Sequence, residues 1–270
     1  MICFPNAKIN IGLYVTQKRP DGYHNIETLF YPTQLKDVLE IIENKNGKED
    51  FVWSYSGIDV DADPEDNLCV KALMLLKKDY EIPPVKMHLH KVIPFGAGLG
   101  GGSADAAFTL KALNQMFDLG IRERKLLEYS AELGADCAFF IYNTPHTATG
   151  IGDVLSPCNI DLKGYHLLLV KPDIHVSTPV AYRGITPRLP EIDFQDQLRL
   201  PVENWKGIIK NDFETAVFPN YPEIEDVKEK MYTKGAVYAS MTGSGAAVFG
   251  LFKEEPDIEF ANCFSWAEIL

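Results

Sequence analysis

Short apolar runs alternate with polar residues through the first part of the chain, with the period of β-strands. Residues 8–15 and 26–42 are rich in β-branched and aromatic side chains, and the turn-forming run 18–22 separates them. Residues 86–93 alternate in part and stop at Pro94, which has no N–H to donate to a sheet. We therefore expect strands in these three segments, with a loop between the first two.

Apolar residues at helical spacing mark three further segments. The first covers residues 66–80 and has an aspartate as its candidate N-cap. The second covers residues 103–117 and stops at Gly120, and the third covers about 123–133. The pattern predicts three helices, with Asp136 at the junction that follows the third.

Prolines interrupt the chain repeatedly between residues 150 and 201, where only short apolar runs occur. We place a domain boundary at the start of this region, which predicts two domains, residues 1–150 and 151–270. In the second domain, residues 222–234 predict a polar helix, and two strands are expected on either side of the glycine-rich run 242–245.

Composition and charge narrow the class of protein. The 270 residues are 46% hydrophobic and 24% charged, which is typical of a globular protein with a sizeable core. The net charge of −12 repels phosphodiester backbones and anionic membrane surfaces, so we expect neither nucleic acid nor membrane as a partner. Five scattered cysteines without a C-x-x-C pair, and the lack of an apolar leader, favour a reduced, cytoplasmic location.

A glycine-rich segment carries the strongest chemical signal. Between Pro94 and Ala107, glycine occupies positions 96, 98, 100, 101 and 102, directly before a predicted helix. A backbone with so few Cβ atoms can wrap closely around an anion, and the first N–H groups of the helix add unpaired donors. The segment predicts a phosphate cradle. It lacks the lysine of the Walker pattern and the acidic residue of a dinucleotide-binding fold, which argues against both.

Three segments resemble the signatures of the GHMP kinase superfamily. Residues 94–107 are similar to its second signature, Pro5-Asn6-Ala7-Lys8-Ile9-Asn10 resembles its N-terminal motif, and residues 241–246 resemble its third, glycine-rich motif. Other segments resemble the superfamily members that phosphorylate a methylerythritol linked to cytidine diphosphate. These are residues 19–24, 28–30, 65–68, 133–136 and 177–180.

The resemblance implies an α+β protein with a two-domain GHMP-kinase-like fold. An N-terminal nucleotide-binding α/β domain and a C-terminal ferredoxin-like α+β domain are expected, with the active site in the cleft between them. The implied reaction transfers a phosphoryl group from ATP, with Mg²⁺, to the 2-hydroxyl of the cytidine-diphosphate-linked acceptor, as a step in non-mevalonate isoprenoid precursor synthesis. A monomer or a weak homodimer is expected.

The same resemblance implies roles for individual residues. Lys8 stabilises charge in the reaction and Asp136 is the general base. Residues 242–245 close the phosphate site, and Ser103 also binds the metal. The residues expected to bind ATP are Asn67, Lys91, Pro94, Phe95, Gly96, Ala97, Gly98, Leu99, Gly100, Gly101, Gly102, Ser103 and Ala104. Of these, Asn67 and Lys91 are expected to flank the adenine. Those expected to hold the acceptor are Asn10, Tyr23, His24, Phe30, Thr178 and Tyr182.

The residues by themselves leave plainer interpretations open. Lys8 can be an edge-strand lysine with its ammonium in water, and Asp136 can cap a short helix. Ser103 can be an ordinary N-cap, Asn67 can serve a helix start, and Lys91 can be a solvated strand residue. The run 242–245 can be a tight hairpin, and the aromatic residues can belong to the core.

Four functions are consistent with the cradle. Beside the kinase described above, these are a GHMP kinase of the homoserine or mevalonate type, a non-catalytic nucleotide-binding module and a nicotinamide dehydrogenase. The superfamily often has Ser-Ser or Ser-Asn where this chain has Ala104-Asp105, so roles for these two side chains do not carry over.

Overall fold

The computed structural model describes residues 1–59 and 63–270, which form two compact units. The first unit contains Met1–Ala7, Gln34–Pro94 and Gly100–Thr144, and the second contains Lys8–Thr33, Phe95–Leu99 and Pro145–Leu270. The chain enters the second unit for the last time after Thr144, having entered it twice before. The single boundary near residue 150 stays a prediction.

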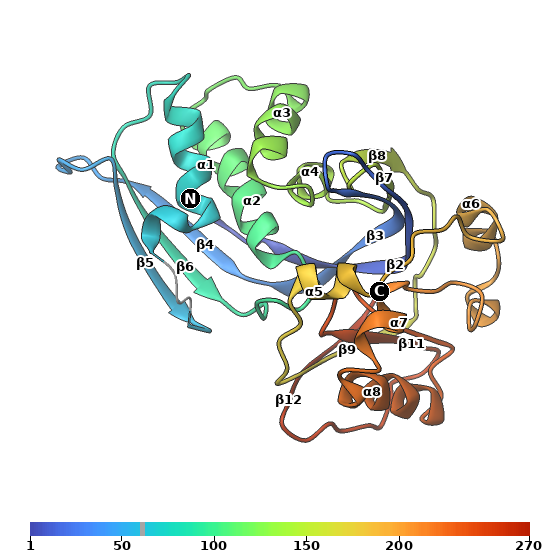
Figure 1. Ribbon diagram of the computed structural model, residues 1–270. Coiled ribbons are helices and arrows are strands. Elements are labelled where there is room, and N and C mark those ends of the chain that lie inside the picture. The colour runs from blue at the N-terminus through green and yellow to red at the C-terminus, as the bar shows by residue number, and fades with distance from the viewer. Residues whose placement is uncertain (60–62) are drawn as a thin grey trace. The chain divides into compact units, whose positions relative to one another are not determined.

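A four-stranded sheet lies on one side of the first unit, and helices cover one of its faces (Figure 1). The strand order is β1 (Ile2–Cys3), β4 (Val38–Glu43), β6 (Val85–Lys91) and β5 (Phe51–Gly57). Strands β5 and β6 are parallel, and the other neighbours are antiparallel. The helices are α1 (Leu68–Lys77), α2 (Gly101–Met116), α3 (Glu123–Leu133) and α4 (Cys137–Tyr142).

Two helices of this unit begin at other residues than the pattern predicts. The side-chain oxygen of Asn67 accepts the N–H of Cys69 at 2.8 Å, so Asn67 caps α1. Asp66, the predicted cap, ends the short 3-10 helix η1 (Pro64–Asp66). Helix α2 begins two residues before Ser103, because Gly100, with a φ of 70°, adopts the left-handed conformation before it.

Two four-stranded sheets form the second unit. The strands of the first are β2 (Asn6–Lys18), β3 (His24–Lys36), β7 (His146–Thr149) and β8 (Val154–Pro157). Those of the second are, in order, β10 (Tyr238–Met241), β11 (Val248–Phe252), β9 (His166–Pro172) and β12 (Cys263–Ile269), all antiparallel. Several elements depart from the predictions. Asp37 divides the strand expected over 26–42 into β3 and β4, and β7, β8, β9 and β12 have no counterpart among the predicted elements.

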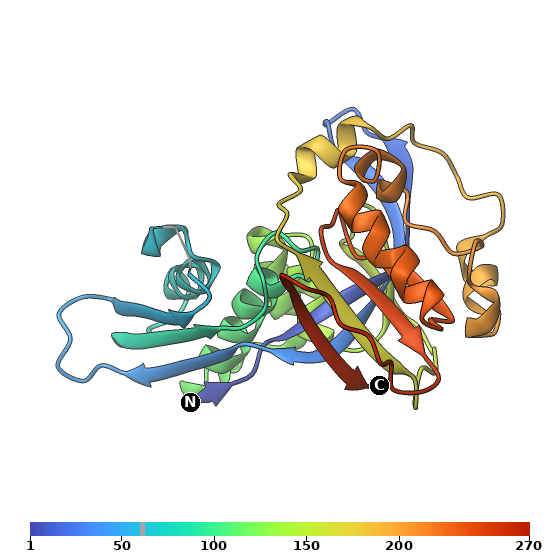
Figure 2. The same ribbon diagram turned by 90° about the horizontal axis from the view of Figure 1, so that it is seen from below.

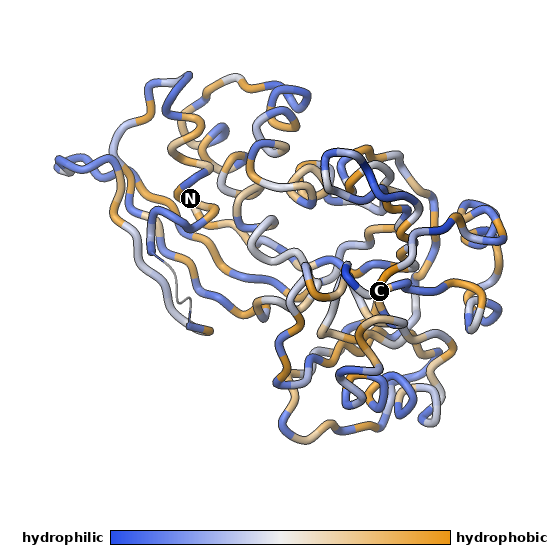
Figure 3. The backbone as a smooth tube through the Cα atoms, in the orientation of Figure 1, coloured by the Kyte–Doolittle hydropathy of each residue, from blue (hydrophilic) through white to orange (hydrophobic). Residues whose placement is uncertain are grey.

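Helix α8 (Pro222–Thr233) packs against β9, β10 and β11 (Figure 2). Its Ile224, Val227 and Met231 join a buried cluster with apolar residues of these strands, and the rest of the helix is hydrophilic (Figure 3). Burial of this apolar stripe stabilises the predicted polar helix. The remaining helices are α5 (Thr178–Arg183), α6 (Phe194–Leu198), α7 (Phe213–Val217) and the 3-10 helix η2 (Val202–Asn204). In the described part of the chain, no helix is long and apolar enough to cross a membrane.

Candidate active site

Lys8 lies in a buried hydrogen-bond network of the second unit. Its side chain is 3% exposed, and its Nζ donates to Asn10 Oδ1 at 2.6 Å and to the carbonyl oxygen of Gly98 at 3.0 Å. The same Nζ lies 5.0 Å from the centroid of the Phe30 ring, which is within cation–π range. Lys8 is therefore not a solvated edge-strand lysine.

Asn10 extends this network to the glycine-rich run 242–245. Its backbone N–H donates to Thr242 Oγ1 at 2.9 Å, and its Nδ2 donates to Thr28 Oγ1 at 3.0 Å. Thr242 donates in turn to the carbonyl oxygen of Gly98 at 3.1 Å. Parts of the three motifs that carry the superfamily resemblance thus contact one another within one unit.

Gly98 and Gly243 pack backbone against backbone. Gly98 has a φ of 73°, and an added Cβ would lie 2.0 Å from the carbonyl oxygen of Thr242. An added Cβ at Gly243 would lie 2.9 Å from the Cα of Gly98. Since no side chain fits at either position, glycine is required there by close approach. The run 242–245 is thus a turn between β10 and β11 that also supports the loop.

Two segments that are predicted to hold the acceptor meet in the second unit. The rings of His24 and Tyr182 stack with their centroids 4.8 Å apart and their planes at 20°. Phe213 contacts the edge of the Tyr182 ring, also with centroids 4.8 Å apart. Burial, with a smaller contribution from Lys18, lowers the pKa of His24.

Three more of the predicted acceptor residues have different environments. Tyr23 is 63% exposed, whereas Phe30 is 1% exposed and packs under the ammonium of Lys8. Thr178, the first residue of α5, has its Oγ1 3.0 Å from Ser244 Oγ in the glycine-rich run. The acceptor-binding roles of these residues stay predictions.

The first turn of α2, in the first unit, contains the last residues of the predicted phosphate-binding segment. With Gly100 as N-cap, the N–H groups of residues 101–103 have no acceptor within the helix. Ala104 differs, because its N–H donates to the carbonyl oxygen of Gly100 at 2.9 Å and offers no free donor. Ser103 is the third residue of the helix and is not its N-cap, contrary to the plainer interpretation.

Gly101 and Gly102 face different surroundings. An added Cβ at Gly101 would lie 2.9 Å from both Lys91 Nζ and Ile93 Cγ2, so this glycine faces the interior of the first unit. An added Cβ at Gly102 would meet Leu68 Cδ1 at 3.7 Å, which is an ordinary contact distance. Gly102 therefore has room for a side chain, whereas Gly101 does not.

Asp136 precedes α4 in the first unit and is partly buried. It occupies the N-cap position of α4, but its carboxylate makes no capping hydrogen bond to that helix within the described residues. The next residue, Cys137, lies beside Ser103. Burial raises the pKa of the Cys137 thiol to about 12, and a hydrogen bond with Ser103 opposes this rise. The residue after Asp136 thus contacts the first turn of α2.

The two residues predicted beside the adenine have other contacts. Asn67 caps α1. Lys91 is 1% exposed and donates to Asp37 Oδ2 at 2.5 Å and to Asp105 Oδ2 at 2.7 Å. Burial by itself lowers the pKa of Lys91, but the two carboxylates outweigh it and raise this pKa. Lys91 is not a solvated strand residue, and the assignment of Asn67 and Lys91 to the adenine stays a prediction.

Among the residues that the structure describes, no group of three or more His, Cys, Asp and Glu side chains could hold a metal ion. Mg²⁺ in nucleotide sites is commonly bound by substrate phosphates, waters and only one or two protein groups. The hydroxyl of Ser103, at the helix turn of the cradle, is a protein group of this kind. The donor set is compatible with Mg²⁺ bound chiefly through phosphate oxygens.

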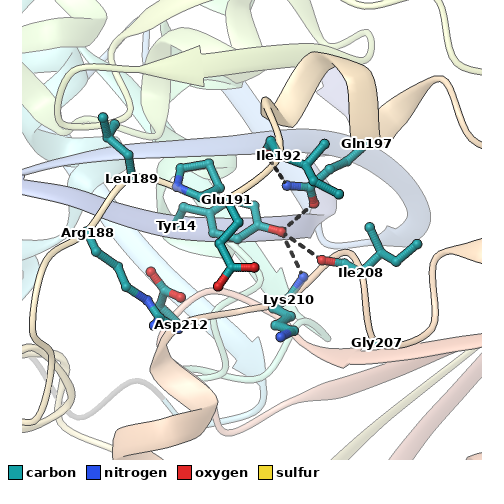
Figure 4. A pocket seen from close by; sticks show the side chains of 11 residues that line it. Tyr14, Arg188, Leu189, Glu191, Ile192, Gln197, Gly207, Ile208, Lys210 and Asp212 are labelled. Carbon is teal, nitrogen blue, oxygen red and sulfur yellow. Dashed lines mark hydrogen bonds between the residues drawn. The ribbon is translucent and has the colours of Figure 1, made fainter.

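A pocket of about 160 Å³ in the second unit is lined by none of the predicted site residues (Figure 4). The Tyr14 hydroxyl, at its wall, lies 2.5 Å from Gln197 Oε1 and accepts the N–H of Lys210 at 3.1 Å. Asp212 accepts the N–H of Val15 at 2.8 Å. The hydroxyl of Tyr14 and the carboxylate of Asp212 at this pocket thus already bond to the protein.

Sequence reasoning missed two residues that support the glycine-rich segment. Asp37 follows Lys36 in a segment that also contains Glu27 and Glu40, so the local sequence did not distinguish it from a solvated strand residue. His175 lies against the loop, because an added Cβ at Gly96 would be 2.7 Å from its Nδ1. His175 is far from the loop in sequence, so no local pattern could have identified it.

Two family models match the chain. The model of the GHMP kinases N terminal domain matches residues 67–144, and that of the GHMP kinases C terminal domain matches residues 191–263. The mixed α/β content and the glycine-rich loop before a helix agree with this match. Fold and site thus define a GHMP kinase.

Individual relatives show to which family within the GHMP kinases the chain belongs. The 4-diphosphocytidyl-2-C-methyl-D-erythritol kinase of Bacteroides fragilis is 55% identical over 269 residues, which cover 98% of each chain. That of Parabacteroides distasonis is 53% identical over 270 residues, with the same coverage. A crystal structure of 4-(cytidine 5'-diphospho)-2C-methyl-D-erythritol kinase has a TM-score of 0.76 and 32% identity, covering 93% of this chain and 90% of that chain. The chain belongs to the family of 4-diphosphocytidyl-2-C-methyl-D-erythritol kinases, and it is an ATP-dependent small-molecule kinase.

Proposed function

We propose that this chain transfers the γ-phosphoryl group of ATP to the 2-hydroxyl of 4-diphosphocytidyl-2-C-methyl-D-erythritol, a step of non-mevalonate isoprenoid precursor synthesis. Relatives named for this substrate align over almost the whole chain at 55% and 53% identity, which favours this acceptor over homoserine or mevalonate. In the structure, the hydrogen bond between Lys8 Nζ and the Gly98 carbonyl carries the proposal, because it seats a buried cation at the glycine-rich loop.

Phosphoryl transfer requires positioning and charge stabilisation more than covalent chemistry. The free N–H groups of residues 101–103 and the loop backbone bind the phosphates, and Lys8 neutralises charge that develops on the transferred group. Asp136 accepts the proton of the 2-hydroxyl group of the acceptor. The hydroxyl oxygen then bonds to the γ-phosphorus of ATP, and the bond between this phosphorus and the ADP oxygen breaks. The hydroxyl of Ser103 would help to hold Mg²⁺ together with phosphate oxygens, and the ion would supply positive charge to offset that of the phosphates.

The acceptor's cytidine end binds at the stacked pair of His24 and Tyr182. A cytosine ring gains stacking energy on such aromatic faces, and exposed Tyr23 supplies a further face. Asn10, Phe30 and Thr178 line the remainder of the acceptor site, and Asn67 serves the adenine end. Lys91 is buried between Asp37 and Asp105 and has no part in this contact. The catalytic chain acts as a monomer or a weak homodimer in the cytoplasm, with domains 1–150 and 151–270.

A panel of acceptors tests this function. The protein is incubated with Mg·ATP and, separately, with the cytidine-linked methylerythritol, methylerythritol phosphate, homoserine or mevalonate, and the products are identified by mass spectrometry. We expect one added phosphoryl group on the cytidine-linked acceptor alone. Phosphorylation of homoserine or mevalonate in its place would assign the chain another acceptor. Binding of ATP without turnover of any acceptor would indicate a non-catalytic nucleotide-binding module. A melting temperature that NAD raises and ATP does not would indicate a dehydrogenase.

A further inference from the structure

Three charged side chains are buried together in the first unit. Lys91, the last residue of β6, is 1% exposed, and its Nζ donates to one oxygen of Asp37 and one of Asp105. Asp37 and Asp105 are 0% and 3% exposed. We call these three residues the loop-end clamp.

The loop-end clamp holds the chain on both sides of the glycine-rich loop. On the strand side, Asp37 Oδ1 accepts the N–H groups of Val92 at 2.6 Å and Ile93 at 2.8 Å, the two residues that precede Pro94. On the helix side, Asp105 is the fifth residue of α2 and accepts from Lys91. The Asp37 carboxylate thus holds the two residues before the loop, and the Asp105 carboxylate connects the helix after the loop to the same Lys91 ammonium.

The ammonium of Lys91 also packs against the first residue of α2. An added Cβ at Gly101 would lie 2.9 Å from Lys91 Nζ, so the absence of a side chain there lets the cation approach the helix start. Residues 101–103 carry the free N–H groups of this helix. The position of those N–H groups therefore depends directly on the position of Lys91.

Burial of three charges is a costly way to hold two elements together. Hydrophobic residues of similar volume often give equal or greater stability, because they avoid the desolvation of the ions. The cost is visible here, since Asp105 Oδ1 is buried and has no hydrogen-bond partner among the described residues. Directional hydrogen bonds, unlike apolar contacts, define the separation and orientation of the groups they join.

We propose that Asp37, Lys91 and Asp105 are positioning residues for ATP, which set the spacing between the end of β6 and the start of α2 and so hold the loop and the helix N–H groups in the geometry that binds phosphate. This assignment rests on the proposed phosphate-binding role of the loop. The three side chains act through the backbone of residues 92–93 and 101–103 and do not touch the nucleotide.

A double variant that removes charge without leaving an unpaired ammonium tests the loop-end clamp. In Lys91→Met/Asp105→Asn, one buried carboxylate, that of Asp37, loses its cation but keeps its two backbone hydrogen bonds, and the volume of both altered side chains is nearly unchanged. Single removal of Lys91 would instead leave two buried carboxylates without their cation, which would destabilise the fold. Leu113→Ala is the matched control, because Leu113 is a buried residue of α2 that lies outside the loop-end clamp.

Mg·ATP and acceptor affinities of the full chain are measured by calorimetry, and amide hydrogen exchange is followed over residues 92–104 without ligand. We expect the double variant to bind ATP about tenfold or more weakly, with faster exchange over this segment and acceptor affinity within about twofold of the wild type. Leu113→Ala should lower the melting temperature without changing ATP affinity.

Three outcomes overturn the assignment. The first is ATP affinity within about twofold of wild type in a folded double variant. The second is weakened ATP binding in the double variant with unchanged amide hydrogen exchange over residues 92–104, which would mean that the altered side chains contact the nucleotide directly. The third is an equal loss of ATP affinity in Leu113→Ala, which would mean a general stability effect. If the wild type binds ATP but phosphorylates no acceptor, the proposed function fails and the loop-end clamp stands.

Discussion

The Nζ of Lys8 donates a 3.0 Å hydrogen bond to the carbonyl oxygen of Gly98, 90 residues further along the chain. Thr242 donates to the same carbonyl oxygen, at 3.1 Å. This one backbone atom thus joins the N-terminal strand, the glycine-rich loop and the C-terminal turn. The buried ammonium of Lys8 is thus held against the backbone of the loop.

Lys8→Met and Asp136→Asn are each expected to reduce turnover by about 10²-fold or more, because the first removes charge stabilisation and the second removes the base. Both substitutions nearly preserve side-chain volume, so the fold should survive. Steady-state kinetics with the cytidine-linked acceptor, together with a melting curve, provide the measurement. Turnover within a few-fold of wild type in either variant would contradict the role of that residue.

Gly98→Ala is expected to destabilise the fold by more than about 2 kcal/mol, because the new Cβ would lie 2.0 Å from the Thr242 carbonyl oxygen. Gly120→Ala is the matched control, since Gly120 has a similar positive φ of 67° but no atom within 4 Å of an added Cβ among the described residues. It should cost about 1–2 kcal/mol from backbone strain alone. Urea unfolding compares the two, and equal losses would show that close packing at Gly98 adds nothing.

Gly102→Val is expected to leave the fold intact and to weaken ATP binding. Its new side chain would extend from a position where the neighbouring atom, Leu68 Cδ1, is 3.7 Å from the Cβ. The branched side chain would then occupy space that the phosphates need. Calorimetry with Mg·ATP measures the effect, and an unchanged affinity would place the phosphates elsewhere.

Tyr182→Ala is expected to weaken acceptor binding by roughly 5- to 150-fold, which corresponds to the loss of about 1–3 kcal/mol of base stacking. ATP affinity should stay nearly the same. A methylerythritol phosphate without cytidine should lose little further affinity in the variant, and the four affinities form a double-mutant cycle. A coupling energy near zero would remove the cytosine from this position. His24→Ala should behave in the same way, because its ring stacks on Tyr182.

The stability of the protein is expected to depend on the titration of Asp105. Burial raises the pKa of this carboxyl to about 7, although Lys91 opposes the rise. An unfolded aspartate has a pKa of about 3.9, so the folded protein binds the proton more tightly. The stabilisation from this group is fully present below about pH 4 and is lost as the pH rises through about 7.

Melting temperatures of the wild type and of Asp105→Asn between pH 5 and pH 8 test this dependence. The wild type should lose stability relative to the variant as the pH increases, because asparagine does not titrate. Parallel curves over this range would mean that Asp105 has the same pKa in the folded and unfolded states.

The amino-acid sequence by itself determined the elements whose signals are local. The glycine-rich segment, the helix after it and the α8 helix are each defined by spacing within one stretch, and the structure confirms these elements. Motifs along the whole length of the chain also led to the family, which the relatives confirm. Helix starts were less accurate, because Asp66 and Asn67 are both good capping residues and the sequence alone could not choose between them.

Only the tertiary structure decided what the polar residues contact. The alternation of β6 places Lys91 on the same side of the strand as the buried Val85, Met87 and Leu89. A lysine at the end of a strand is nevertheless expected to be solvated unless its acidic partners are known. Asp37 and Asp105 lie 54 and 14 residues away in sequence, and folding brings them to one ammonium. Contacts of this kind depend on how strands and helices pack, so no pattern within a single segment contains them.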